Sequence, residues 1–322
     1  LLPKTEIFLR CRVADHHGGG HNCCFPPEDL GNIYFHYTIV SSVERIERTM
    51  IMFKLAFSTL GCPGWSWEEI YATCKDLGIN GIEIRGIESE IYAPNCKPFR
   101  EENIEKTLDT LKKLDIEIPM LTSAAYLFDK EKEEEALSEA KAYIHRAQRI
   151  RTPYIRVLGD KDGAPGEERD LDFVKTQYQK VCDYAADKNV MPLIETNGVL
   201  AETNVMAEFI KAVDRPNTGI LWDIHHPFRY FKETPETTLN HLDGYIKYVH
   251  IKDSVMENGK VSYRMLGYGD VPVLDCLKQL NKNGFEGYVS LEWLKRWCPE
   301  LQEPGVVFSH YINYMSYLIR QI

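Results

Sequence analysis

The feature that most constrains the fold is a regular alternation of short strand-like runs with amphipathic helical stretches, which starts near Met52 and continues to the C-terminus. Each run is rich in β-branched and aromatic residues, and the stretch that follows has apolar residues at helical spacing. The predicted strands are 54–58, 81–85, 117–122, 154–158, 191–195, 219–223, 246–251 and 287–292. Such alternation predicts an α/β fold with a parallel sheet, and eight units predict a closed (β/α)8 TIM barrel.

Capping signals mark the predicted helices. Ser66 is a plausible N-cap for the first helix, and Gly78 is a stop signal at its end. The predicted helices are 67–77, 101–114, 130–150, 170–188, 203–213, 235–242, 273–281 and 306–319. An open doubly wound sheet is the alternative fold. The chain has neither a Gly-x-Gly-x-x-Gly motif after the first strand nor a Walker sequence, which disfavours that alternative.

Residues 1–51 do not share the alternation. We expect them to be an extension outside the barrel, either disordered or translated from upstream of the natural start. The remainder, 52–322, suits one barrel domain, which typically takes about 250 residues. The alternative for the extension is a metal site. Its candidate ligands are His16, His17, His21, Cys23 and Cys24, whose spacing matches no zinc signature.

Composition narrows the possible partners. The formal net charge is -10, from 48 acidic against 38 basic residues, which disfavours nucleic acid and anionic membranes. No uncharged apolar run approaches the ~18 residues of a membrane span. Nine cysteines without a Cys-x-x-Cys motif suit a reducing compartment, so we predict a cytoplasmic protein. A homo-oligomer is possible, with Phe228, Tyr230 and Phe231 as exposed loop aromatics at the contact.

Four consecutive predicted strands end in metal-ligand residue types: Glu195, Asp223, His250 and Glu292. In a barrel, the C-terminal strand ends form the active site, and each of the four has the same parity as inward residues of its strand. Any one of them alone is most simply an ordinary polar rim residue. Three crowded carboxylates need a cation to offset their repulsion. We expect Mn2+, with Mg2+, Co2+ or Zn2+ as alternatives, because oxygen-rich sets suit hard divalent ions.

Several segments resemble the sugar phosphate isomerase/epimerase family of xylose-isomerase-like TIM barrels. The segments are IETN at 194–197, WDIHH at 222–226, VHIKD at 249–253, LGYGDV at 266–271 and GFEGYVSLE at 284–292. The resemblance covers 52–322 and is most specific in the second half. The family is related to ketose 3-epimerases, inosose dehydratases and endonuclease-IV-type enzymes. The resemblance implies one divalent ion held by the four strand-end residues.

The resemblance also implies a metal-dependent isomerase or epimerase acting on a sugar, sugar phosphate or related polyol. A proton would leave the carbon next to a carbonyl bound to the metal, giving an enediolate, with Glu195 and Glu292 as the catalytic carboxylates. The run 195–202 lacks the arginine that ketose 3-epimerases would have after Glu195. Isomerisation, and an inosose-type dehydration on the same metal site, therefore stay open beside epimerisation.

Four further residues are predicted to bind the substrate: His226, Lys252, Glu83 and Arg85. His226 follows Asp223 by three residues, where the family places a substrate-contacting histidine. Glu83 and Arg85 have inward parity on the second strand, so they either pair with neighbouring residues or face the substrate. The alternatives are a hydrogen-bonded rim histidine for His226 and an exposed loop lysine for Lys252.

Weaker candidates for a substrate carboxylate or phosphate are Arg156 and Arg229. The amides around Gly267 and Gly269 are a possible anion site, although an ordinary loop is the simpler interpretation.

Two rival functions remain. An endonuclease needs several rim histidines and DNA binding, but His145, His241 and His310 fall in predicted helices and the chain is acidic. A non-catalytic barrel that binds a sugar has no need of two acid/base glutamates.

Overall fold

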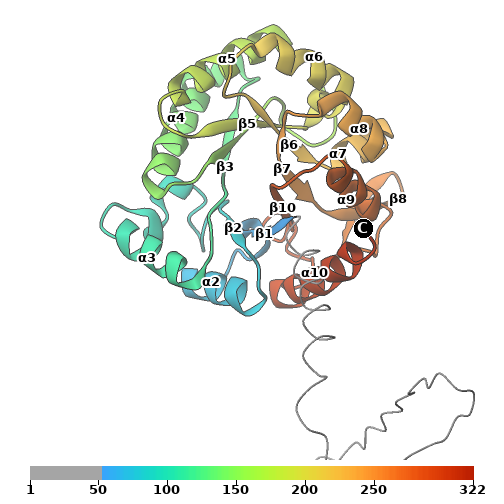
Figure 1. The fold of residues 1–322 in the computed structure, drawn as a ribbon. Helices are drawn as coiled ribbons and strands as arrows, with labels where there is room; N and C mark the ends of the chain where they lie inside the picture. The colour runs from blue at the N-terminus through green and yellow to red at the C-terminus, as the bar shows by residue number, and fades with distance from the viewer. Residues whose placement is uncertain (1–52) are drawn as a thin grey trace, which may run out of the picture. The chain divides into compact units, whose positions relative to one another are not determined.

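The computed structural model describes residues 53–322, which form a closed parallel barrel surrounded by helices (Figure 1). The predicted extension, with its alternative metal site, lies outside the described residues. The barrel strands are β1 (Lys54–Ser58), β2 (Gly81–Glu83), β3 (Met120–Tyr126), β4 (Tyr154–Leu158), β5 (Met191–Glu195), β6 (Gly219–Asp223), β7 (Ile246–Ile251) and β10 (Tyr288–Leu291). The predicted barrel is therefore confirmed.

The sheet closes between its first and last members. The strand order is β2-β1-β10-β7-β6-β5-β4-β3, and all these pairs are parallel. Bridges between β2 and β3 complete the ring, with the Ile84 amide donating to Met120 at 3.0 Å and the Thr122 amide donating to Ile84 at 2.9 Å. The third strand starts later than the predicted residue 117, because Pro119 has no amide to donate to a ladder.

The outer helices match the predicted set within a few residues. They are α2 (Trp67–Asp76), α3 (Ile104–Leu114), α4 (Glu133–Ile150), α5 (Leu171–Ala185), α6 (Thr203–Val213), α8 (Pro235–Leu242), α9 (Val273–Lys282) and α10 (Pro304–Ile319). Ser66 caps α2 as predicted. Its hydroxyl accepts from the Glu69 amide at 3.3 Å, and the Glu69 carboxylate accepts from the Ser66 amide at 2.7 Å. Among residues 53–322, no helix is long and apolar enough to cross a bilayer.

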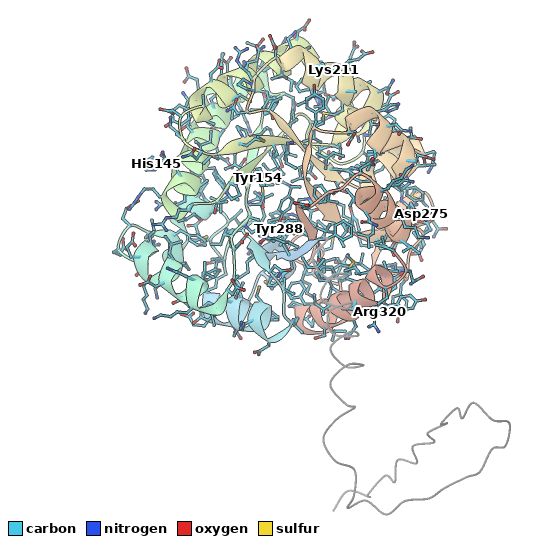
Figure 2. All side chains as sticks on the ribbon, in the orientation of Figure 1. His145, Tyr154, Lys211, Asp275, Tyr288 and Arg320 are labelled. Atoms are coloured by element: carbon cyan, nitrogen blue, oxygen red, sulfur yellow. The ribbon has the colours of Figure 1, made fainter. Side chains whose placement is uncertain are left out.

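The hydrophobic core has two layers. The larger one lies between the strands and the helices. The smaller one fills the barrel interior, and its buried members are Ala56, Met120, Leu193, Leu221, Tyr248 and Tyr288. Figure 2 shows Tyr154 and Tyr288 near the barrel centre, and Lys211, Asp275 and Arg320 on the outer helices. Leu193, Leu221 and Tyr248 precede three of the candidate ligands by two residues, which confirms the predicted inward parity.

The chain also has elements near the barrel rim that were not predicted. A short helix, α7 (His225–Phe231), follows β6, and an antiparallel hairpin, β8 (Asp253–Glu257) with β9 (Lys260–Arg264), follows β7. The hairpin turns at Asn258-Gly259, both with positive φ, which is a turn signal that the sequence contains.

The aromatics of α7 correct one prediction. Phe228, Tyr230 and Phe231 were expected on an exposed loop, but all three are partly buried, and Phe228 packs against the core. The reason is that the chain turns straight from β6 into a helix that lies back on the barrel rim.

Gly198 is required by the loop after β5. It has a φ of +56°, and an added Cβ would lie 2.2 Å from Asp160 Oδ2. We expect Gly198→Ala to lower the free energy of unfolding by about 2 to 4 kcal/mol, from left-handed backbone strain and overpacking. Urea denaturation measures the loss. Gly166→Ala is the control, because an added Cβ there meets nothing within 4 Å. Equal stability of the two variants would contradict this interpretation.

Candidate metal centre

The four strand-end residues converge at the C-terminal end of the barrel. Glu195 and Asp223 end β5 and β6, His250 lies near the end of β7, and Glu292 directly follows β10. Their exposed fractions are 2%, 0%, 0% and 5%. One ligand atom from each lies within 4.8 Å of the others. The structure therefore brings together the whole set that the sequence analysis selected.

His250 is oriented by a carboxylate behind it. Its Nε2 lies 2.9 Å from Glu83 Oε2, and since a carboxylate only accepts, the ring nitrogen donates. Thr122 donates to the other oxygen of Glu83 at 3.3 Å. His250 Nδ1 is buried without a hydrogen-bond partner, 3.6 Å from Glu292 Oε1 and 3.9 Å from Glu195 Oε1. A histidine held this way by one nitrogen commonly binds a metal ion through the other.

Two basic side chains touch the carboxylates. Arg156 on β4 donates from Nη1 to Glu195 Oε2 at 3.0 Å and lies 3.7 Å from Glu292 Oε1. Lys252 Nζ lies 2.5 Å from Glu292 Oε2 and also contacts Asp223 Oδ2. The predicted rim lysine is thus buried among the candidate ligands, and Arg156, a weaker candidate, is equally central.

With His250 counted as neutral, this cluster has two more negative charges than positive ones. Its four buried carboxylates are Glu83, Glu195, Asp223 and Glu292, and its two permanently charged basic groups are Arg156 and Lys252. Buried charge is costly unless it is balanced, so the excess of negative charge favours a divalent cation. The donor chemistry, the free His250 nitrogen and the charge balance all fit such an ion.

The neighbours control the ionisation of the two glutamates. Burial alone would raise the pKa of Glu195, but Arg156 and His250 bring it below its ordinary value. Burial likewise opposes ionisation of Glu292, and Lys252 and His250 lower its pKa to about 2. Burial would lower the pKa of His250, but Glu83 and Glu292 raise it well above the usual value. Both glutamates are therefore carboxylates at neutral pH.

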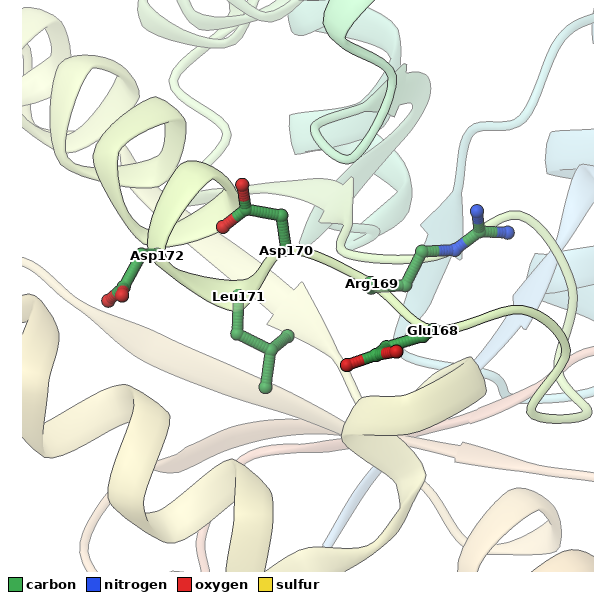
Figure 3. Close-up of a pocket in the computed structure, with 5 residues that line it drawn as sticks. All are labelled: Glu168, Arg169, Asp170, Leu171 and Asp172. Atoms are coloured by element: carbon green, nitrogen blue, oxygen red, sulfur yellow. The ribbon is translucent and has the colours of Figure 1, made fainter.

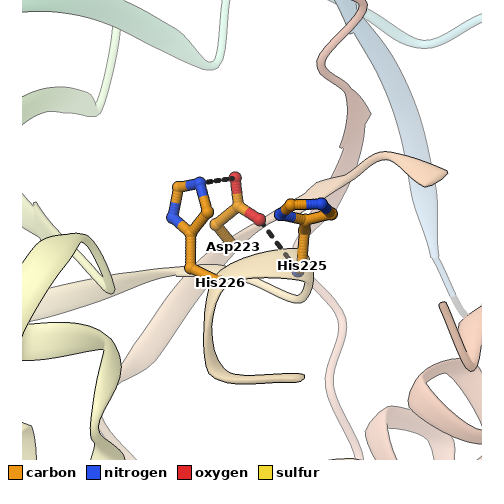
Figure 4. A group of neighbouring side chains, drawn as sticks. All are labelled: Asp223, His225 and His226. Atoms are coloured by element: carbon orange, nitrogen blue, oxygen red, sulfur yellow. Dashed lines mark hydrogen bonds and ion pairs between the residues drawn. The ribbon is translucent and has the colours of Figure 1, made fainter. Parts of the chain in front are cut away.

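Asp223 lies between His226 and His225 (Figure 4), and one ligand atom from each of the three lies within 4.8 Å of the others. The side chain of His226 bonds through Nδ1 to the Thr196 carbonyl at 2.9 Å, which leaves Nε2 3.7 Å from Asp223 Oδ2. The His225 amide donates to Asp223 Oδ1 at 2.9 Å, and its ring bonds to Ser254 at 2.9 Å. Of these two neighbouring histidines, His226 is the one whose Nε2 is directed at the Asp223 carboxylate.

The weaker candidates for an anion site already bind acidic side chains of this protein. Arg229 pairs with Asp270. The Gly267 and Gly269 amides each donate to Asp253 Oδ2 at 2.9 Å, so the anion that these amides bind is the protein's own carboxylate.

A loop between β4 and α5 covers the site, and sequence reasoning missed it. An added Cβ at Gly163 would lie 2.4 Å from His226 Nε2, so the loop backbone passes directly over that ring. The Gly163 carbonyl accepts from the Gly198 amide at 3.2 Å, and Asp160 pairs with Arg169 at 2.7 Å. Only glycine allows this approach, and the run Asp-Gly-Ala-Pro-Gly was the available signal.

Two hollows of the described residues do not contain this cluster. A hollow of about 570 Å³ at the start of α5 is lined by Glu168, Arg169, Asp170, Leu171 and Asp172 (Figure 3). A second, of about 530 Å³, lies beside α2 and α3. Both are lined in part by acidic side chains, but by none of the four candidate ligands, so the buried donor set locates the site better than cavity volume does.

Glu83 is expected to position His250. We expect Glu83→Gln to weaken metal binding by about 10- to 100-fold, because loss of a carboxylate behind a ligand histidine has effects of this size. Competition with a chromogenic chelator measures the affinity. Glu88→Gln, at an exposed position in the loop that follows β2, is the control. Unchanged affinity in a folded Glu83→Gln protein would show that the 2.9 Å contact does not matter for the metal.

Comparison with known proteins supports the same barrel. The family model described as the xylose isomerase-like TIM barrel matches residues 71–307. Fructoselysine 3-epimerase of Shigella flexneri is 21% identical over 258 residues, which are 77% of this chain and 92% of that protein.

Two solved structures also superpose on this chain. A xylose isomerase-like TIM barrel protein from Mycobacterium smegmatis, in complex with magnesium, has a TM-score of 0.65 and 16% identity, over 84% of this chain and 97% of that one. The 3-keto-D-glucoside 4-epimerase of E. coli has a TM-score of 0.63 and 17% identity, over 84% and 100%. With the family model matching well over half of its length, the chain belongs to the xylose isomerase-like TIM barrel family.

Proposed function

We propose that this protein is a divalent-metal-dependent isomerase or epimerase of a sugar, sugar phosphate or related polyol. The observation that carries the proposal is the buried set of three carboxylates and one imidazole, with ligand atoms within 4.8 Å of one another. Similarity to a fructoselysine 3-epimerase supports the substrate class and the type of reaction.

Glu195, Asp223, His250 and Glu292 would hold the ion. When bound, it would supply positive charge beside the substrate carbonyl and so acidify the adjacent C–H. Three oxygen donors and one nitrogen donor favour Mn2+ among the candidate ions, with Mg2+, Co2+ and Zn2+ as alternatives.

Glu195 and Glu292 would transfer the proton. Arg156 bonds to Glu195 and also lies near Glu292, and Lys252 bonds to Glu292 from the β7 side, so both carboxylates are held in place by basic groups. One would accept the proton from the activated carbon as a carboxylate, and the other, after taking up a proton from solvent, would return it to the opposite face. His226, through its free Nε2, and Lys252, through its ammonium, would orient substrate oxygens.

Dehydration is the second candidate. Its support is the position of Lys252, whose ammonium contacts both Asp223 and Glu292. After a glutamate removes the C–H proton, elimination of a neighbouring hydroxyl needs a proton donor, and Lys252 would deliver that proton so that water leaves.

Deuterium exchange tests the proposal. Protein loaded with Mn2+ is incubated in D2O with ketoses, inososes and sugar phosphates, and the products are followed by NMR. We expect deuterium at the carbon next to the carbonyl, dependent on the metal. An epimer or isomer as product supports the first candidate, and loss of water supports the second. A sugar that binds without any exchange would favour a non-catalytic sugar-binding barrel instead.

A further inference from the structure

We propose that the substrate carries an anionic group, a carboxylate or a phosphate, which Arg85 binds at the mouth of the barrel. The inference rests on the proposed function, because it places the reacting end of the same sugar at the metal centre. The observation behind it is a buried guanidinium that lacks a counterion.

Arg85 is the exception among the buried basic side chains of the described residues. These side chains are Arg85, Arg156, Arg229 and Lys252. Three of them contact carboxylates: Arg156 with Glu195, Arg229 with Asp270, and Lys252 with Glu292. Arg85 is 8% exposed, and within residues 53–322 no carboxylate oxygen lies within 4.0 Å of its guanidinium.

The remaining contacts of Arg85 do not balance its charge. Its side chain makes one hydrogen bond within the described residues, from Nη1 to the Ile91 carbonyl at 3.3 Å. The charge of Glu139, which lies beyond 4.0 Å and accepts from the Ala124 amide at 2.6 Å, raises the pKa of Arg85 but does not offset the opposite effect of burial and Arg156. A buried charge is costly unless it is paired, and burial together with the charge of Arg156 lowers the pKa of Arg85. An anion from outside the chain would supply the missing partner.

Arg85 lies where a substrate bound at the metal centre would extend. It lies just beyond the C-terminal end of β2, two residues after Glu83, and the Glu83 carboxylate contacts His250. Since the C-terminal strand ends face the mouth of the barrel, the backbone of Arg85 lies on the mouth side of that contact. Its guanidinium carbon lies 5.8 Å from the ring centre of Trp297, which is 51% exposed in the segment after β10.

The chemistry of this position favours an acid over a neutral sugar. Guanidinium N–H groups form a planar fork that matches carboxylate and phosphate oxygens, and an aromatic face beside the fork helps to hold its plane. A hydroxyl group in that place would leave the charge of Arg85 uncompensated. Sugar acids and sugar phosphates are therefore the substrate class that the site selects.

Binding of matched ketoses tests the inference without requiring turnover. The probes are D-fructose, D-fructose 6-phosphate and 5-keto-D-gluconate, titrated calorimetrically into the Mn2+-loaded protein, with inorganic phosphate and acetate as probes that need no sugar. At least one anionic ketose should bind tenfold or more tightly than fructose. Whichever of D-fructose 6-phosphate and 5-keto-D-gluconate binds more tightly shows whether the anionic group is a phosphate or a carboxylate.

Variants at Arg85 test whether this residue causes the preference for anionic ketoses. In Arg85→Gln the preference should fall below threefold, and Arg85→Lys should keep part of it. The melting temperature of Arg85→Gln should stay unchanged or rise, because the variant removes an unpaired buried charge. If Arg85 only stabilised the fold, the melting temperature of Arg85→Gln would fall. Arg320→Gln, at the exposed end of α10, changes the net charge equally and should keep the native preference.

Two results would overturn the inference. One is that neither anionic ketose, nor phosphate or acetate, binds native protein better than fructose. The other is that Arg85→Gln keeps the native preference. Failure of the proposed function looks different, because it appears as absence of bound metal or of deuterium exchange, whatever the charge of the ligand.

Discussion

Turnover by Glu195→Gln and by Glu292→Gln is expected to fall by about 10²- to 10⁴-fold each, the usual contribution of a positioned acid or base. Gln keeps the size of the side chain and an oxygen donor but cannot accept a proton. Both residues are almost fully buried and held by basic partners, so the change should not displace them. Rates are measured at saturating Mn2+, with bound metal quantified in each variant. Glu208→Gln, exposed on α6, is the control.

The two variants should differ in isotope exchange. If Glu195 serves one face of the substrate and Glu292 the other, each variant loses interconversion of the epimers. Each should still exchange deuterium into one epimer, and the two variants should act on opposite epimers. Turnover that survives both substitutions would refute the proposed roles.

Removal of the metal ion should abolish turnover and lower the melting temperature by about 5 °C or more. The reason is the uncompensated negative charge that four carboxylates and two basic groups leave in a buried cluster. An ion at about 100 times its dissociation constant stabilises the fold by about 2.7 kcal/mol, and each kcal/mol is worth about 2 °C in a domain of this size.

Calorimetry measures this shift. Protein treated with EDTA and dialysed is compared with protein restored by one equivalent of Mn2+, Mg2+, Co2+ or Zn2+, and the order of recovery identifies the ion. Asp223→Asn is the matched variant, because it removes one ligand charge and should reduce the shift that the metal produces. An identical melting temperature with and without metal, together with no metal in the purified protein, would contradict the proposed centre.

The sequence was sufficient to predict the barrel and the candidate ligands, because both depend on local periodicity. Alternation of strand and helix patterns determines a parallel barrel, and parallel strands place all their C-terminal ends on one rim. Parity along a strand then selects inward residues. That is why Glu195, Asp223, His250 and Glu292 were identifiable from strand ends alone, and why their buried neighbours Leu193 and Leu221 lie in the barrel interior.

Other features depended on contacts that no local pattern encodes. The approach of the β4–α5 loop to His226 depends on packing between distant segments, and the partial burial of Phe228 depends on how α7 lies on the rim. The β8–β9 hairpin is different, because its Asn258-Gly259 turn was readable and was overlooked.

The sequence by itself therefore determined the fold and which residue types meet at the rim. Only the tertiary structure decided how they interact. His250 and Glu83 are 167 positions apart, and their contact leaves Nδ1 as the free donor. Arg156 and Lys252 became partners of the glutamates, while Arg85 was left without a counterion. The physical reason is that charge pairing depends on distances across the barrel, and only folding brings strands from distant parts of the chain to one rim.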